Sequence, residues 1–350
     1  MLRKENFTEN HIRKIQYKSK KDPMLIERTI YAFGLLEAIA KTGMPFIFKG
    51  GTCLMLLISK PYRLSTDIDI VVEPGTDVVK YIEKASKIFP FIKYEENKRI
   101  GKNNIEKQHF KFTYYSPISG KEFYILLDVL FEHNHYAKLE NKIIKNELLI
   151  TDEDNIYICV PSIECILGDK MTAFAPHTTG IPLNEGKNME VMKQFYDVSV
   201  LLDYYQNFED VKNTYNMIAL SEIRYRGIEC TPLNCIEDTF DASLCIASRG
   251  KCFISDYPAY VSGIRDLKGH IYSEKYSPEI AVGDAAKIAY MSVCLMYDTE
   301  FEKVADYRAY TNDRLSQKDL IHTKYLRKAN PQAYAYMIKT DRILKEYRIL

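Results

Sequence analysis

Two aspartates at the start of a strand constrain this chain more than any other feature. Residues 48–72, FKGGTCLMLLISKPYRLSTDIDIVV, read as a short strand, a glycine turn, an apolar helix and a second strand that starts around Asp67 and Asp69. Residues i and i+2 of a strand point the same way, so we expect both carboxylates on one face. Like charges that close repel unless a cation lies between them, and Mg2+ binds such carboxylates together with substrate phosphates. The structural alternative is that Asp67 caps a turn and Asp69 pairs with Arg63.

The glycine turn before the helix is the second candidate feature. Adjacent glycines let a phosphate approach backbone N–H groups, and the following helix N-terminus adds a favourable dipole. Two glycines before a helix can also form a simple tight turn. The aspartate pair that follows strengthens the interpretation of the glycines as a phosphate-binding turn. The candidate nucleotide-binding residues of this region are Gly50, Gly51, Thr52, Arg63 and Ser65.

Asp128 interrupts the apolar run of residues 123–131, FYILLDVLF. A carboxylate in the middle of such a strand is costly unless it meets a cation or hydrogen-bond donors. A metal ion shared with Asp67 and Asp69 would satisfy it, and it could also be the base that deprotonates an attacking hydroxyl. The alternative is an aspartate on an edge strand that faces solvent. Glu132, at the end of the run, is a secondary candidate.

Two predicted helices further along carry charged candidates. Lys170 falls on the apolar stripe of a helix in SIECILGDKMTAFA, residues 162–175. A lysine that faces inward needs a partner, and a triphosphate would serve; the alternative is a lysine that snorkels to solvent. In the next helix we expect Lys193 and Asp197 on the polar side, either as functional residues or as a solvated i,i+4 pair.

The order of elements predicts an α/β core at residues 1–160 and a helical C-terminal domain at 161–350 that contributes Lys170 and Asp197 to the site. The polar N-terminus is expected to form a loosely ordered helical arm. Within the core, helices are predicted at 23–42, 52–59 and 77–89, and strands at 46–49, 66–73, 107–115 and 122–132, the last two joined as a hairpin.

Composition narrows the class of protein. The chain has 350 residues, 46% hydrophobic and 27% charged, as is ordinary for a folded soluble protein of one large or two smaller domains. No stretch approaches the ~20 apolar residues that span a bilayer. The eight cysteines show no C-x-x-C spacing, which favours reduced thiols in a cytoplasmic protein over disulfides or a zinc site.

The net charge of +1 provides no global field to attract nucleic acid, so any RNA contact must come from a local patch. Two segments combine lysine, arginine and tyrosine, at residues 93–111 and 314–328, and could flank a phosphate backbone. Glutamates interrupt the first segment, which favours a solvated surface there.

Four segments taken together resemble the AbiEii/AbiGii toxin family of nucleotidyltransferases, from abortive-infection, type IV toxin–antitoxin systems. They are residues 48–72, LLDVLFE (126–132), GDKMTAFAPHTTGIP (168–182) and MKQFYDVSVLL (192–202). The resemblance implies a DNA polymerase β-like nucleotidyltransferase fold with a mixed sheet and an appended helical domain. It also implies roles for single residues: Gly51 and Thr52 in the phosphate-binding step, Asp67 and Asp69 as the metal pair, Asp128 as a third carboxylate, and Lys170 and Asp197 in the later motifs. The usual Gly-Ser step is replaced here by Gly-Gly-Thr, whose hydroxyl is still expected to reach phosphate.

The resemblance further implies a function in phage defence. A nucleotide would pass from an NTP to an RNA, with the 3′ end of tRNA as acceptor and Mg2+ as cofactor, and a cognate antitoxin would be a partner. The alternatives are transfer to a protein or small molecule, a regulator that binds NTP without turning it over, and an interaction protein whose aspartates are structural.

Overall fold

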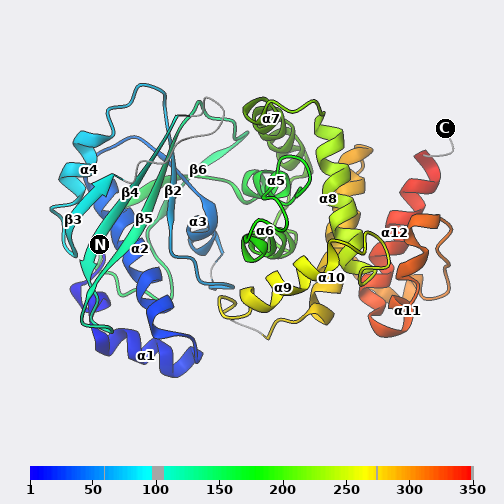
Figure 1. Ribbon diagram of the computed structural model, residues 1–350, viewed down its shortest axis with the longest axis horizontal. Coiled ribbons are helices and arrows are strands. Elements are labelled where there is room, and N and C mark those ends of the chain that lie inside the picture. The colour runs from blue at the N-terminus through cyan, green and yellow to red at the C-terminus, as the bar shows by residue number, and fades with distance from the viewer. Residues whose placement is uncertain (59, 97–105, 273–274, 348–350) are drawn as a thin grey trace. The chain divides into compact units, whose positions relative to one another are not determined.

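The computed structural model describes residues 1–58, 60–96, 106–272 and 275–347, which form two compact units. The first unit contains Met1–Ser162 together with Gly269–Glu274, and the second contains Ile163–Lys268 and Lys275–Leu350 (Figure 1). The first is built around a sheet and the second from helices (Figure 1). The expected α/β part with a mixed sheet, followed by a helical C-terminal part, is therefore confirmed.

A seven-stranded mixed sheet forms the centre of the first unit (Figure 1). Only the β5–β2 and β1–β7 pairs are parallel, and the other neighbours are antiparallel. In spatial order the strands are β3 (Phe91–Glu96), β4 (Lys107–Tyr115), β5 (Glu122–Phe131), β2 (Ile68–Val72), β1 (Ile47–Lys49), β7 (Tyr157–Pro161) and β6 (Leu139–Ile143).

The two faces of this sheet differ because side chains alternate along each strand. Phe48, Ile68, Phe110 and Leu127 point to one face and are almost completely buried. On the opposite face Lys49, Asp69, Leu126 and Asp128 are half-exposed, so this part of the face is open, although Val71 and Thr113 are buried. The helices of this unit are α1 (Glu9–Ser19), α2 (Pro23–Lys41), α3 (Gly50–Leu57) and α4 (Val79–Ala85), with a 3-10 turn η1 (Lys4–Phe7); α2 packs against β2, β5 and α4.

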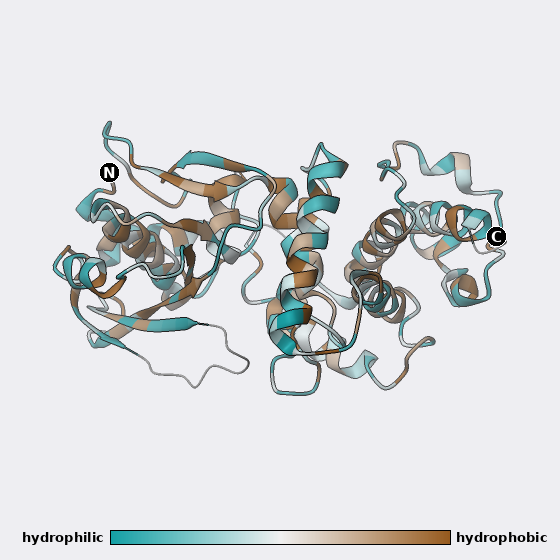
Figure 2. Cartoon of the chain, turned by 90° about the horizontal axis from the view of Figure 1, so that it is seen from above, coloured by the Kyte–Doolittle hydropathy of each residue, from teal (hydrophilic) through white to brown (hydrophobic). Residues whose placement is uncertain are grey.

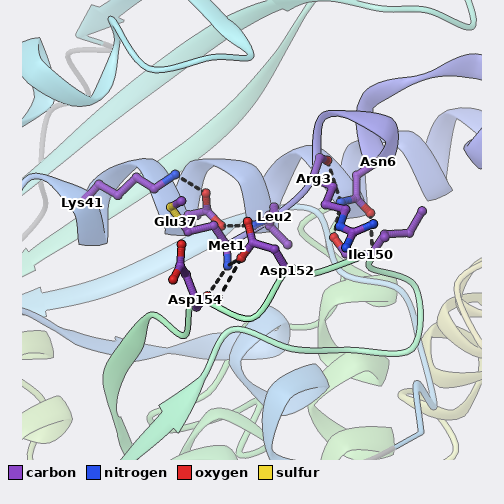
Figure 3. A network of polar contacts seen from close by, with 9 residues as sticks. All are labelled: Met1, Leu2, Arg3, Asn6, Glu37, Lys41, Ile150, Asp152 and Asp154. Carbon is purple, nitrogen blue, oxygen red and sulfur yellow. Dashed lines mark hydrogen bonds and ion pairs between the residues drawn. The ribbon is translucent and has the colours of Figure 1, made fainter.

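The N-terminal arm is ordered, contrary to the expectation of a loose segment. Its helix α1 buries Ile12 and Ile15 and packs on α2. Figure 3 shows the contacts of the residues before it: the Leu2 amide donates to Glu37 Oε2 at 2.6 Å, and the Arg3 amide to the Ile150 carbonyl at 3.0 Å. Ile12 and Ile15 are apolar in the sequence, but the polar composition of the segment around them did not indicate a packed helix.

The second unit consists of helices whose apolar faces meet in one core. Phe174 and Phe195 pack edge to face at 5.2 Å, and Tyr260 lies against Phe174. Figure 2 shows hydrophobic and hydrophilic stretches alternating along the helices. The elements are α5 (Ile163–Ala173), α6 (Asn188–Leu201), α7 (Phe208–Arg226), α8 (Pro232–Ala247), α9 (Tyr257–Leu267), α10 (Pro278–Met296), η2 (Tyr307–Tyr310), η3 (Lys318–Thr323), α11 (Leu326–Ala329) and α12 (Pro331–Tyr347).

One short segment belongs to the first unit although the chain reaches it only after α9. Residues 269–272, which we call the strap, lie beside the loop that joins α3 to β2. The Leu64 amide donates to the His270 carbonyl and the Tyr272 amide to the Tyr62 carbonyl, both at 2.8 Å. Ile271 pairs with Arg63 in an isolated antiparallel bridge and is completely buried. The strap was not predicted, because nothing local marks a few residues as a sheet partner for a distant loop.

Candidate active site

At both glycines of the turn from β1 into α3, polar side chains occupy the space that a Cβ would fill. Gly50 has a φ of +81°, and an added Cβ would overlap the Asp69 carboxylate. At Gly51 a Cβ would overlap the Arg63 guanidinium and lie 2.8 Å from Ser65 Oγ. The helix begins at Gly50, two residues earlier than predicted, so the Gly-Gly step lies in its first turn.

Thr52 has a different role from the one expected. Its side chain is completely buried, and its hydroxyl donates to the Asp67 carbonyl at 2.7 Å. The Thr52 hydroxyl therefore fixes the start of the aspartate strand instead of facing a phosphate. The substitution of threonine for the usual serine is compatible with this contact, since either hydroxyl can donate it.

Directly paired residues form a polar row across the open face of the sheet. Lys49 of β1 lies opposite Asp69 of β2, Asp69 is the register partner of Asp128 in β5, and Asp128 lies opposite His109 of β4. All four residues are half-exposed. Register partners on adjacent strands share a face and lie about 5 Å apart, so the row gathers two carboxylates between a lysine and a histidine.

Asp128 lies neither in an apolar environment nor on an edge strand. Strand β5 is central, and Asp128 points to the open face with its side chain 36% exposed. Its Oδ1 is 2.6 Å from His109 Nδ1. His109 was missed by the sequence reasoning, although it sits in the alternating run KQHFKFTYY; the register that places it beside Asp128 is not visible in the sequence.

Asp67 precedes β2 and contacts residues outside the polar row. Its Oδ1 lies 3.8 Å from Arg28 Nη2 of α2 and accepts a 3.4 Å hydrogen bond from the Thr66 hydroxyl. Glu132, just after β5, pairs with His135 at 2.9 Å. In the described part of the chain, no three His, Cys, Asp or Glu side chains lie close enough together to hold a metal ion.

The donor set nevertheless suits a hard cation. Asp69 and Asp128 are carboxylates on neighbouring strands, beside Asp67 two residues along the chain, and all three are partly exposed. Carboxylate oxygens are the ligands that Mg2+ prefers. The contacts of Asp67 with Arg28 and of Asp128 with His109 each use the Oδ1 atom of the carboxylate.

Lys170 and Asp197 come together inside the second unit. The Lys170 ammonium is 3.0 Å from Asp197 Oδ2 and donates to Gln194 Oε1 at 2.8 Å. Their side chains are 9% and 0% exposed. The expectation that Asp197 lies with Lys193 on a polar helix face is therefore wrong: Asp197 points inward, to a partner on α5. The helical wheel of α6 alone does not show that partner.

Several general expectations can be compared with the structure. All eight cysteines are free. Within the described residues, no helix is long and apolar enough to cross a membrane. Residues 97–105 of the first basic segment, 93–111, lie outside the described residues. The second basic segment, 314–328, is described throughout.

Comparison with known proteins places this geometry in a family. A glycine turn beside paired carboxylates on an open sheet face suits an enzyme that handles phosphates. The family model "Nucleotidyl transferase AbiEii toxin, Type IV TA system" matches residues 35–245, well over half of the chain. The chain thus belongs to the AbiEii family of nucleotidyltransferase toxins of type IV toxin–antitoxin systems.

Solved structures show only a distant likeness. JHP933 from Helicobacter pylori is 15% identical with a TM-score of 0.44, the alignment covering 78% of this chain and 93% of that one. A candidate nucleotidyltransferase from H. pylori is 14% identical with a TM-score of 0.45, covering 79% and 99%. A search of curated proteins found no match. Membership of the family implies an NTP substrate and a cognate antitoxin.

Proposed function

We propose that this toxin transfers a nucleotide from an NTP to RNA, with Mg2+ as cofactor and the 3′ end of tRNA as acceptor. The polar row beside the Gly50–Thr52 turn supports the proposal most directly, because it gathers two carboxylates between a lysine and a histidine, with the Asp69 carboxylate next to Gly50. Asp69 and Asp128, with Asp67, would hold the ion. Bound there, Mg2+ would supply positive charge to the phosphates.

Residues of the glycine turn would bind and orient the nucleotide. The missing side chains of Gly50 and Gly51 leave space that the Asp69 carboxylate and the Arg63 guanidinium occupy, and Lys49, Arg63 and Ser65 line the same turn. The acceptor hydroxyl would form a bond to the α-phosphorus as the bond to the leaving pyrophosphate breaks, with its proton released to solvent. For such a step the protein contributes mainly positioning and charge stabilisation.

His109 and the strap would contribute indirectly, by positioning Asp128 and Arg63. His109 contacts Asp128 and fixes the direction of its carboxylate. The strap holds the loop that carries Arg63. We retain Lys170 as a candidate phosphate ligand, with Asp197 as the carboxylate that orients its ammonium; their direct contact supports this pairing.

The test is incubation with each labelled NTP and total RNA. We expect label in RNA with wild type and none with Asp69→Asn. The control is Asp77→Asn, an exposed aspartate of the same unit, which should label RNA normally. Label in a protein or a small molecule would show that RNA is not the acceptor. NTP binding without any transfer would favour the alternative of a regulator that binds NTP without turning it over.

Metal dependence is measured separately, as a thermal melt with EDTA or with Mg2+. Binding to the folded state should raise the Tm of wild type by mass action. Asp128→Asn should shrink that rise. An equal rise in Asp128→Asn and wild type would exclude Asp128 as a ligand.

A further inference from the structure

The C-terminal end of the second unit carries a basic surface that the proposed catalysis does not use. Segment 314–328 holds five lysine and arginine residues and one acidic residue, Asp319, a net charge of +4 in a chain whose total is +1. It lies beyond residues 35–245, the part that matches the family.

The fold brings a second basic turn to this segment. The end of α8 and the turn after it, residues 247–252, contact this segment in three places. Arg249 lies over the Tyr325 ring at 5.1 Å, the Tyr325 hydroxyl donates to the Ala247 carbonyl at 2.8 Å, and Cys252 Sγ is 3.7 Å from the Asp319 carbonyl. We define the basic patch as Arg249, Lys251, Lys318, Lys324, Arg327 and Lys328.

The basic patch is available to a ligand. All six residues are exposed, and within the described ranges none of them forms an ion pair. Buried neighbours anchor the backbone beneath them, since Leu320, Thr323 and Leu326 are completely buried. Next to the turn, Phe253 and Ile254 are 47% and 79% exposed and offer apolar surface beside the charges.

We infer that the basic patch binds the phosphodiester backbone of RNA, and so docks the acceptor on the helical unit. Several exposed cations, which form no ion pair within the described part of the chain, offer positive charge to the phosphates of a nucleic-acid backbone. An arginine on an aromatic ring and an exposed Phe253 add planar surfaces on which unpaired bases can stack. The inference rests on RNA as the acceptor in the proposed function.

The test is binding of labelled tRNA by the full chain at increasing salt. The patch variant is Lys324→Glu/Arg327→Glu/Lys328→Glu. The matched control is Arg224→Glu/Arg265→Glu/Lys268→Glu, three exposed basic residues of the same unit, with the same change in net charge. We expect the patch variant to bind at least tenfold more weakly near 0.1 M salt, with a salt slope smaller by about two. The control should stay within about threefold of wild type.

Several outcomes would overturn the inference. They are equal binding by both variants, an unchanged salt slope, and poly-L-glutamate binding wild type as tightly as tRNA, which would indicate an acidic protein partner. A Gln version of the patch variant, checked by thermal melting, covers the case in which charge reversal unfolds the protein. Asp69→Asn separates the two proposals, because it should bind tRNA normally and transfer nothing; if wild type transfers nothing but binds through the basic patch, only the proposed function fails.

Discussion

At the residue scale, Gly50 carries two constraints at once. Its positive φ disfavours any side chain, and its missing Cβ leaves room for the Asp69 carboxylate. The chain provides a comparison in Gly75, whose φ is +84° but where an added Cβ would have nothing within 4 Å. A comparison of substitutions at Gly50 and Gly75 therefore distinguishes the effect of backbone strain from the effect of the contact with the Asp69 carboxylate.

We predict that Gly50→Ala destabilises the protein more than Gly75→Ala and abolishes transfer. Gly75→Ala should cost about 1 kcal/mol, the strain of a left-handed alanine, and keep full activity. Gly50→Ala adds the displacement of Asp69. Urea unfolding and the labelling assay measure both effects. Equal losses in the two variants would show that the Asp69 contact contributes nothing.

At the element scale, the contact between α5 and α6 depends on a buried ion pair. From the sequence, Lys170 was expected either to face a triphosphate or to snorkel to solvent. The structure instead pairs it with Asp197, which is completely buried and would lose its cation if Lys170 were removed. Removing one partner of such a pair typically costs about 3–5 kcal/mol.

Lys170→Ala should therefore lower the free energy of unfolding by about 3–5 kcal/mol, whereas Lys193→Ala, on the more exposed side of α6, should lower it by less than about 1 kcal/mol. The double variant Lys170→Met/Asp197→Leu should lose less than Lys170→Ala, since no buried charge remains unpaired. Urea titrations compare the three. A stable Lys170→Ala would restore the interpretation of Lys170 as a snorkelling lysine.

A comparison of individual elements with their predictions shows which features the sequence reveals and which it does not. Strand β4 was predicted with its observed bounds and β5 within one residue, because their apolar and polar residues alternate around a turn signal. The short strands β3, β6 and β7 were not predicted, because few residues carry each pattern. Asp69 and Asp128 were recognisable as charges in apolar runs. His109 and the partner of Asp197 were not, because cross-strand register and helix–helix contacts join residues with no fixed spacing in the sequence.

At the scale of the whole molecule, the strap links the integrity of the first unit to a segment that follows α9. Ile271 is completely buried beside the loop of Arg63, and Leu267, four residues earlier, is equally buried but belongs to the second unit. Each residue can be truncated to alanine with a similar loss of apolar contact.

Both Ile271→Ala and Leu267→Ala should cost about 2–5 kcal/mol of stability. Only Ile271→Ala should also raise the KM for NTP, because it loosens the loop beside Gly51. The measurement is NTP-dependent transfer well below the melting temperature of each variant. A similar rise in KM for Leu267→Ala would mean that lost stability, and not the strap, weakens nucleotide binding.

The position of the strap also sets an order of events during synthesis. A growing chain presents Asp67 and Asp69 early, but the segment that completes their neighbouring loop emerges about 200 residues later, on the order of 10–40 s at ~5–20 residues per second. Until then the Leu64 amide and the Tyr62 carbonyl lack the hydrogen bonds that the strap provides. We expect the nascent toxin to gain its nucleotide site only once most of the helical unit has been made, so that a partly translated chain harms its own ribosome and cell little.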